Sequence, residues 1–391
     1  MIRLLTFSTL YPNAVSPGHG IFVETRLQQL VASGEVASRV VAPVPWFPFR
    51  HRLFGEYARH AAVPARETRN GLDIVHPRYF LLPRIGMNRA PGALARAGIA
   101  AIRKAVAAGH DFDIIDAHYF YPDGVAAVRI GRALGKPVVI TARGSDINLI
   151  PEYPEPRRMI LDAAAQAAAI VAVSAALKVR MQEIGIDGQR ISVLRNGVDL
   201  ELFHPQERAA ARVRLGASGF VLASVGNLIS TKGHHLVMEA LASLPDAELF
   251  IAGRGPEEQR LKALAERLGV AGRVKFLGVL PQAELRILYS AADCLVLASA
   301  REGWPNVLLE AMACGTPAIA SRVGGTAEII TAPEAGLLVD SGDAGAIVAA
   351  VTELRRRLPE RAATRRHAER FGWNETTRGQ IALFDKLCRR I

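Results

Sequence analysis

Residues 294–320 read CLVLASAREGWPNVLLEAMACGTPAIA, and their pattern predicts one repeating unit of the fold. A short apolar run at Cys294–Leu297 is followed by a loop, a helix-period segment at Val307–Ala313 and a second apolar run at Ala318–Ala320. Strands that are apolar on both faces and alternate with helices are typical of parallel sheets covered by helices. We therefore expect a strand–helix–strand unit of an α/β protein.

The same alternation runs through the rest of the chain. The other predicted strands are Ile2–Thr6, Arg39–Ala42, Asp73–His76, Ile114–His118, Val138–Thr141, Ile170–Val173, Ser192–Leu194, Phe220–Val225, Glu248–Ala252, Val274–Leu277 and Leu337–Val339. Together these are more strands than one open sheet comfortably holds. The 391 residues also exceed a prior of ~150 residues per domain. The expected fold class is α/β, with two Rossmann-like, doubly wound parallel-sheet domains that face a central cleft.

The domain boundary is predicted just after the run Asn196–Asp199. This run ends one strand pattern, and a polar, Ala/Arg-rich segment follows before Phe220 begins another. The resulting domains are residues 1–199 and residues 200–373. The tail, residues 374–391, is amphipathic and is expected to pack back on the N-terminal domain as a helix.

Composition excludes several classes of protein. Hydrophobic residues make up 50% of the chain and charged residues 22%, which rules out a disordered or fibrous chain. The three cysteines form no C-x-x-C pair, so neither a disulfide framework nor a zinc module is predicted. The sequence has no signal-peptide pattern and no apolar run of ~18 residues. We therefore expect a cytoplasmic protein.

Positive charge is concentrated in residues 50–104. This segment holds 11 Lys and Arg residues against three acidic residues, a net +8 of the chain's +11. Aromatic residues lie within or beside it, at Trp46, Phe47, Phe49, Phe54, Tyr57, Tyr79 and Phe80. Such a mixture suits an anionic inner-leaflet membrane surface or a lipid-linked phosphate, and the alternative is a solvated arginine-rich face. No nucleic-acid partner is expected, because no helix-turn-helix, RNA-recognition or zinc signature accompanies the charge.

Three places in the first half carry candidate functional residues directly after predicted strands, where ligands of open α/β sheets bind. The first is the Pro17-Gly18-His19-Gly20 turn, where glycines allow close approach of a ligand and a following helix offers amides to a phosphate. The second is His118, whose neutral ring could polarise a hydroxyl. The third is Arg143, within Thr141–Asp146.

The strongest cluster lies in the second half. Gly226–Gly233 joins a strand to a helix and places Lys232 where an ammonium and helix amides neutralise a diphosphate. It lacks the order of a Walker A loop. Glu302 lies in the loop after Cys294–Leu297, and Glu310 lies in the next helix. These two carboxylates could face one cleft and bind vicinal hydroxyls.

On these motifs the chain resembles the retaining GT-B glycosyltransferases that carry the E-x7-E motif. This family 4-like group includes hexosyltransferases of bacterial cell-surface polysaccharide and glycolipid synthesis. The resemblance covers nearly the whole chain, and its most specific block is EGWPNVLLEAMACGTPAIAS, from Glu302 onward. The Tyr11-Pro12-Asn13 opening and the Tyr121–Gly124 run are also similar to a branch with teichuronic-acid-type transferases.

The resemblance implies roles for the matching residues. Residues 1–199 would bind a glycan or lipid-linked acceptor, and residues 200–373 would bind a nucleotide-diphosphate sugar. The catalytic residues would be His118 near the reacting sugar, Glu302 on the transferred sugar and Lys232 on the diphosphate. The donor-binding residues would be Gly18, Gly20, Arg143, Asn227, Lys232, Phe276, Leu277, Gly278, Glu302, Gly303, Trp304, Pro305, Asn306, Val307, Leu308 and Glu310.

Two positions depart from the family's pattern. Many relatives carry an arginine beside the lysine, whereas this chain has Asn227, which cannot supply that charge. Arg143 stands where histidine is common, and we expect it to contribute part of the missing positive charge.

No metal and no cofactor are expected, and the nucleotide sugar is a co-substrate. Asp111-Phe112-Asp113 has D-x-D spacing but precedes a predicted strand, and the neighbours His234 and His235 would diverge on a helix. Lys232 and helix-terminal amides would then stabilise the leaving diphosphate. No carboxylate is placed to act as the nucleophile of a double displacement. The resemblance implies front-face transfer with retention of configuration at the sugar. It also implies that the enzyme acts at the inner membrane.

Three alternatives remain open from the sequence, and one of them is a non-catalytic protein that binds a nucleotide sugar. A GT-B epimerase or phosphorylase would share the fold without acceptor transfer. A nucleotide-dependent oxidoreductase of two Rossmann domains would need a G-x-G-x-x-G fingerprint after the first strand of a domain. Gly253-x-Gly255 is followed by Glu258 where the third glycine belongs, and this disfavours the oxidoreductase.

Overall fold

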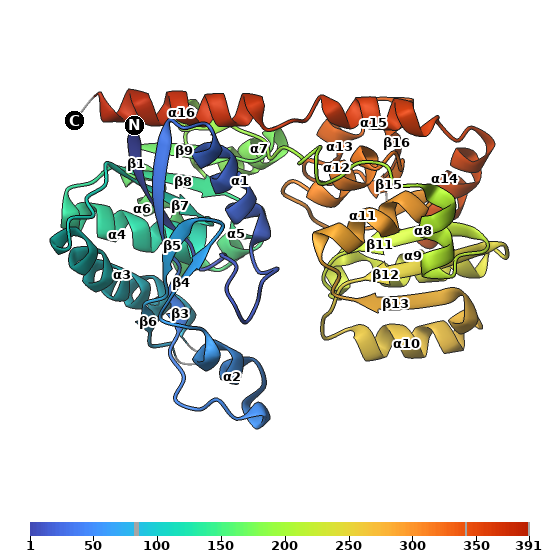
Figure 1. Ribbon diagram of the computed structural model, residues 1–391, viewed down its shortest axis with the longest axis horizontal. Coiled ribbons are helices and arrows are strands. Elements are labelled where there is room, and N and C mark those ends of the chain that lie inside the picture. Colours follow the sequence, from blue (N-terminus) through green and yellow to red (C-terminus); the bar gives the residue numbers. More distant parts are fainter. Residues whose placement is uncertain (82–85, 341, 390–391) are drawn as a thin grey trace. The chain divides into compact units, whose positions relative to one another are not determined.

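The computed structural model describes residues 1–81, 86–340 and 342–389 (Figure 1). Contacts divide the chain into unit 1, Met1–Arg195 with Asn374–Ile391, and unit 2, Asn196–Trp373. The sequence pattern placed the boundary four residues later, after residue 199. Each unit is built on its own mainly parallel sheet, which confirms the α/β fold class with two Rossmann-like domains.

Unit 1 contains an eight-stranded sheet with the order β10-β9-β8-β7-β1-β2-β5-β4. All its strand pairs are parallel except β4 with β5 at one edge. The strands are β1 Ile2–Phe7, β2 Val36–Val41, β4 Arg66–Arg69, β5 Leu72–Val75, β7 Ile114–His118, β8 Val138–Ala142, β9 Ala169–Ala172 and β10 Ile191–Val193, with a separate pair of β3 Val44–Pro45 and β6 Arg78–Tyr79.

The helices of unit 1 come from both ends of the chain. They are α1 Ile21–Ala32, α2 Gly55–Ala62, α3 Ala90–Ala107, α4 Val125–Leu134, α5 Ser145–Asn148, α6 Pro154–Gln166, α7 Ala175–Glu183 and the C-terminal α16 Asn374–Cys388. Helix α16 buries Ile381 and Phe384 in a cluster with Leu4 of β1 and Leu30 of α1. The last segment of the chain is therefore part of the core of unit 1 (Figure 1).

Unit 2 contains a six-stranded, fully parallel sheet with the order β13-β12-β11-β14-β15-β16. Its strands are β11 Phe220–Val225, β12 Ala247–Ala252, β13 Val274–Gly278, β14 Cys294–Leu297, β15 Ala318–Ser321 and β16 Gly336–Val339. Its helices are α8 Arg208–Leu215, α9 His234–Ala242, α10 Glu258–Arg267, α11 Gln282–Ala291, α12 Asn306–Ala313, α13 Thr326–Ile329, α14 Ala344–Arg356 and α15 Arg361–Glu369.

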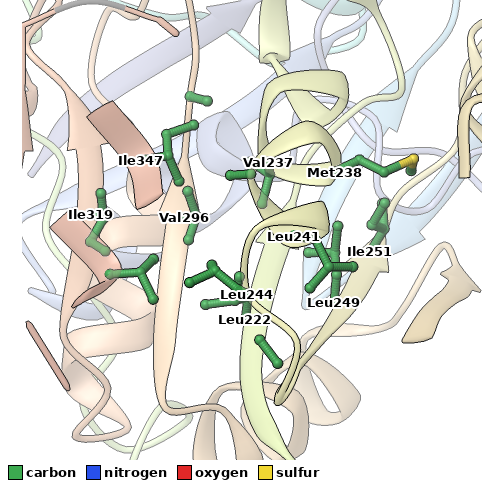
Figure 2. Close-up of a cluster of buried hydrophobic side chains, with 14 of the residues drawn as sticks. Leu222, Val237, Met238, Leu241, Leu244, Leu249, Ile251, Val296, Ile319 and Ile347 are labelled. Atoms are coloured by element: carbon green, nitrogen blue, oxygen red, sulfur yellow. The ribbon is translucent and has the colours of Figure 1, made fainter. Parts of the chain in front are cut away.

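One core of unit 2 lies between its sheet and helices α9, α10 and α14. Figure 2 shows Leu222, Leu249 and Val296 of the sheet facing Val237 and Leu241 of α9, all of them nearly inaccessible to solvent. Burial of a side chain of this size contributes roughly 1.5–3 kcal/mol, so this core fixes the strand ends from which the candidate site is built.

Each sheet has one point where the strand order reverses. In chain order, the parallel strands of unit 2 are arranged 3-2-1-4-5-6, so the reversal lies between β11 and β14. In unit 1 it lies between β1 and β7. Ligands of such sheets bind beyond the carboxyl ends of the strands at these reversals, which makes the loops after these four strands the candidate sites.

None of the described helices is both long and apolar enough to cross a membrane.

Candidate functional site

In unit 2, the loop after β11 brings Lys232 to the edge of the sheet where the strand order reverses. Gly233 ends this loop with φ 70° and caps α9, and a Cβ atom there would lie 2.0 Å from the carbonyl oxygen of Ala298. Only glycine fits this close approach of two loops. The Nζ atom of Lys232 then lies 2.6 Å from Oε1 of Glu302, which follows β14. The structure therefore brings together two residues that the sequence placed 70 positions apart.

The loop that carries Glu302 is held by its backbone. Gly324 has φ 52°, and a Cβ atom there would lie 1.9 Å from the Glu302 carbonyl oxygen. The Gly325 amide donates to the Gly303 carbonyl oxygen at 3.2 Å. The Glu302 side chain is 9% exposed and that of Lys232 is 26% exposed, so the ion pair is shielded without being closed to a ligand.

Glu310 lies in the second turn of α12 and has a different environment. The Tyr289 hydroxyl of α11 donates to its Oε2 atom at 3.0 Å. Burial raises the pKa of Glu310 to about 7, and the hydrogen bond from Tyr289 partly opposes this rise. The carboxyl group therefore changes its charge near neutral pH, whereas an ordinary glutamate is fully ionised there.

The residues between the two glutamates divide into supports and accessible groups. The Trp304 indole is buried and donates to the Asn196 carbonyl oxygen at 2.9 Å, and Pro305 is also buried. The Leu308 amide donates to the Pro305 carbonyl oxygen at 3.1 Å. Asn306 and Val307 begin α12 and are partly exposed. Of the backbone amides between the two glutamates, those of Asn306 and Val307 therefore lie on partly exposed residues and remain candidates for holding the phosphate.

The loops after β11, β12 and β13 also meet. The Gly253 amide donates to the Gly278 carbonyl oxygen at 2.7 Å, and the Leu228 amide donates to that of Arg254 at 3.0 Å. Asn227 is exposed beside Leu228, and Phe276 and Leu277 are partly exposed on β13. Sequence reasoning did not assign a role to Arg254, an exposed cation that this contact brings to the same loops.

In unit 1, His118 ends β7 and is buried with both ring nitrogens engaged. Nδ1 lies 2.6 Å from Nη2 of Arg143, and Nε2 lies 3.2 Å from Oδ2 of Asp116. A guanidinium only donates, so Nδ1 accepts and the neutral ring carries its proton on Nε2. Burial lowers the pKa of His118 to about 4, with Asp116 opposing this shift and Arg143 adding to it. The ring is therefore neutral at pH 7.

A buried polar chain continues from His118 to the C-terminal helix. Gln380 of α16 donates to Asp116 at 3.2 Å and accepts from the Arg26 guanidinium at 2.7 Å. Burial opposes ionisation of Asp116, but His118, Arg26 and Arg143 bring its pKa below the ordinary value. No local sequence pattern predicts this network of polar side chains, because its members lie up to 354 residues apart.

Arg143 lies between His118 and the first loop of unit 1. Its guanidinium carbon is 5.3 Å from the centre of the Phe22 ring, in the first turn of α1. Gly20 caps that helix with φ 68°, and a Cβ atom there would lie 2.3 Å from the Leu10 carbonyl oxygen. Gly18 lies in the same turn with open space around it. The three candidate regions of unit 1 therefore converge where its strand order reverses.

Asp146, which the sequence grouped with Arg143, holds the loops in place. Its carboxylate accepts from the amides of Phe120, Arg143 and Gly144 at 2.6–3.2 Å. It thereby joins the loop after β7 to the loop after β8. Its side chain is buried, so this carboxylate is a support of the site and presents no free charge to a ligand.

Two patterns that the sequence set aside have structural partners. Asp111 and Asp113 form ion pairs with Lys136 and Arg3 at 3.0 Å and 2.5 Å. His234 is buried against the Ser224 hydroxyl at 2.8 Å, with its Nε2 atom 3.3 Å from the Asn227 carbonyl oxygen. Within the described ranges, no group of three or more His, Cys, Asp or Glu side chains is placed to hold a metal ion.

Two family models match successive parts of the chain. Residues 58–202 match Glycosyltransferase Family 4, and residues 206–371 match Glycosyl transferases group 1. Together they span both units.

Curated relatives match over nearly their full length. A D-inositol 3-phosphate glycosyltransferase of Catenulispora acidiphila is 30% identical, with 98% of this chain and 95% of the relative covered. TuaC of Bacillus subtilis, whose name assigns it to teichuronic acid biosynthesis as a glycosyltransferase, is 29% identical over 90% of this chain and 88% of the relative.

Solved structures share the fold at low sequence identity. A sucrose-phosphate synthase from Thermosynechococcus elongatus superimposes with a TM-score of 0.81 at 20% identity, and all of both chains is covered. Anabaena HepE in complex with UDP-glucose gives 0.75 at 21% identity, over 98% of both chains.

Proposed function

Because the chain belongs to the family 4-like glycosyltransferases of the GT-B fold, we propose that it transfers a hexosyl group from a nucleotide-diphosphate sugar to a glycan or lipid-linked acceptor. The setting would be the synthesis of cell-surface polysaccharide or glycolipid. The name of TuaC supports this class of acceptor, whereas the name of the D-inositol 3-phosphate glycosyltransferase specifies a small phosphorylated cyclitol. HepE, which was solved with UDP and with UDP-glucose, supports the class of donor.

One observation carries the donor part of the proposal. Lys232 and Glu302 form a 2.6 Å ion pair where the strand order of unit 2 reverses, and Glu310 follows on α12. An ammonium group suits a diphosphate, and carboxylates suit the hydroxyls of a sugar and a ribose. We assign the diphosphate to Lys232, the transferred sugar to Glu302 and the ribose to Glu310.

In this proposal, donor binding exchanges the partner of Lys232. The ammonium group turns from Glu302 toward the diphosphate, and the released carboxylate accepts hydrogen bonds from the sugar. Arg254 adds positive charge beside the position where relatives carry arginine and this chain carries Asn227. Asn306 and Val307 supply amides, and the base lies along Phe276–Gly278.

We propose that His118 positions the Arg143 guanidinium near the reacting sugar by accepting its hydrogen bond. Gly18 and Gly20 would lie in the loop beside Arg143. Because His118 is neutral at pH 7, the positive charge in contact with its ring comes from the guanidinium of Arg143. Leaving-group stabilisation by these cations and by helix amides would make transfer independent of metal. Attack of the acceptor on the face that the diphosphate leaves would retain the configuration at the sugar. The enzyme would act at the cytoplasmic face of the inner membrane.

The test is a donor screen followed by transfer. Purified protein is titrated with UDP-, GDP- and ADP-sugars, and transfer from the donor that binds is measured with and without EDTA. We expect one donor class to bind, activity to survive EDTA, and the product to keep the anomeric configuration of the donor. Release of a free epimer, or of a sugar phosphate with inorganic phosphate as acceptor, would instead identify an epimerase or a phosphorylase.

A further inference from the structure

An unusual group of exposed aromatic side chains projects from unit 1. Here the aromatic tip means residues 46–57 together with Phe80. Ring centres of Phe47 lie 5.3 Å from Tyr57 and 5.4 Å from Phe54, and those of Phe49 and Phe54 lie 5.2 Å apart. The Trp46 and Phe80 rings are 6.2 Å apart. The rings therefore pack against one another, and their outer faces are not covered by the core of unit 1.

These side chains stay accessible to solvent. Leu53 is 84% exposed, Phe80 61%, Phe49 54% and Trp46 48%. Single exposed apolar residues are ordinary, but a contiguous apolar patch marks a surface that contacts another phase or partner. In Figure 1 the segment with α2 extends away from the eight-stranded sheet of unit 1.

The base of the aromatic tip is anchored to unit 1. Strand β3 pairs with β6, and the Trp46 amide donates to the Tyr79 carbonyl oxygen at 2.7 Å. Arg59 of α2 donates to the Ser16 hydroxyl at 2.9 Å, and Arg78 donates to the His60 carbonyl oxygen at 2.9 Å. The exposed rings are therefore presented on a held scaffold and do not belong to a free loop.

Ion pairs within the protein limit which arginines of residues 50–104 can face a membrane. Arg69 pairs with Glu24 at 2.9 Å, and Arg66 pairs at 2.6 Å with Asp73, a carboxylate that it shares with Arg39, so the charge of Arg69 is compensated and that of Arg66 is partly compensated within the protein. Arg50 is exposed within the aromatic tip itself. Arg89, Arg96, Arg103 and Lys104 are exposed on and before α3, while Arg84 and the side chain of Arg52 lie outside what the structure describes.

We propose that the aromatic tip inserts into the headgroup region of an anionic lipid bilayer, with Arg50 beside the lipid phosphates. Trp, Phe and Leu side chains flanked by arginine are the chemistry that interfacial protein segments use. Residues 46–57 carry two arginines, Arg50 and Arg52, against a single acidic residue, Glu56, so the net charge of this segment complements anionic headgroups. This proposal deepens the membrane part of the proposed function and names its contact residues.

The experiment is cosedimentation of the full chain with vesicles of phosphatidylcholine alone or with 30% phosphatidylglycerol. The main variant is Phe49→Ser with Leu53→Ser, two exposed positions whose change leaves the core intact. The control is Val179→Ser, an apolar residue of α7 whose exposure, 53%, matches the 54% of Phe49. We expect the wild type and the control to bind anionic vesicles, and the double variant to bind at least ~10-fold more weakly.

A second pair of variants tests the charge. Arg50→Gln should weaken binding to anionic vesicles at low salt, whereas Arg66→Gln should weaken it less, because Asp73 already compensates part of that charge. Three results would overturn the proposal: a wild type that ignores anionic vesicles at low salt, equal binding to phosphatidylcholine alone, or unchanged binding by the double variant. A double variant that only turns a dimer into a monomer would assign the tip to a second copy.

Hydrolysis of the donor without acceptor is measured on the same samples. Lost vesicle binding with intact hydrolysis separates the aromatic tip from the donor site. Intact vesicle binding by a protein that binds none of the UDP-, GDP- and ADP-sugars would instead refute the proposed function and leave the membrane surface standing.

Discussion

Two side chains, Lys232 and Glu310, carry the proposed donor site at the scale of single residues. Replacing either by alanine removes one charge-assisted contact, which costs ~3 kcal/mol of transition-state stabilisation in a shielded site. We expect Lys232→Ala and Glu310→Ala each to lower transfer at least ~100-fold while leaving the fold intact. Lys386→Ala is the control, since this exposed lysine lies on α16 of unit 1, whereas the donor residues belong to unit 2. Near-normal turnover in a folded Lys232→Ala or Glu310→Ala protein would remove that residue from the site.

The raised pKa of Glu310 predicts how donor affinity depends on pH. Ribose hydroxyls donate to a carboxylate, and only the ionised form accepts from both. With a pKa of about 7, the ionised fraction in the free protein rises between pH 6 and pH 8. If only that form binds, affinity for the nucleotide sugar should rise up to about tenfold over this range.

Calorimetric titration with the nucleotide sugar measures this dependence. Glu310→Gln should bind more weakly and with a flat pH profile. This variant also separates Glu310 from Asp123, whose pKa burial likewise raises to about 7 but which belongs to unit 1. A persistent tenfold dependence in Glu310→Gln would assign the titration to another group.

At the scale of elements, Gly233 shows how a close approach of two loops forms the site. Gly233 and Gly269 have nearly the same left-handed φ, 70° and 68°, but a Cβ atom meets Ala298 at the first and nothing within 4 Å at the second. Gly269→Ala should therefore cost only the backbone strain, ~1 kcal/mol. Gly233→Ala should cost clearly more in the free energy of unfolding and also weaken donor binding, because the loop carrying Lys232 must move.

If urea unfolding showed equal losses of stability in the two glycine variants, the Ala298 backbone would be able to move aside without lowering the free energy of unfolding. Intact donor binding in Gly233→Ala would show that this loop does not set the position of Lys232.

The elements also show how far the sequence predicted the structure. Strands β7, β11 and β14 coincide with their predicted ranges, because each is a short, mostly apolar run between helical segments. The edge strand β4, Arg66–Arg69, was missed because all four of its residues are polar. Helix α8 was taken for a linker, since of its residues only Ala211 is buried.

The site was predictable in its positions but not in its contacts. Residues just after strands are brought together by any parallel sheet, so Lys232 and Glu302 could be paired as candidates from the sequence. Two contacts could not be predicted: the Asp146 carboxylate accepts from amides of two loops, and both ring nitrogens of His118 have partners. Both depend on loop conformations that no local sequence pattern determines.

At the scale of the whole molecule, the order of segments predicts which unit depends on the C-terminus. Unit 2 is one continuous segment, Asn196–Trp373, whereas unit 1 needs α16 from the end of the chain. Phe384 of α16 is fully buried in unit 1, and Lys386 is exposed on the same helix. Loss of the Phe384 side chain should therefore lower the stability of unit 1 and leave that of unit 2 unchanged.

Phe384→Ala should lower the stability of unit 1 by ~3–5 kcal/mol, the usual cost of truncating a buried phenylalanine, and should leave unit 2 unchanged. Hydrogen exchange followed by mass spectrometry reads both units in the same sample. Amides of β1 and β7 should exchange faster in the variant, while those of β11 and β14 keep the wild-type rate, and Lys386→Ala should change neither set. Equal acceleration in β7 and β11 would mean that the two units unfold together, because local stability would then no longer follow the separate cores.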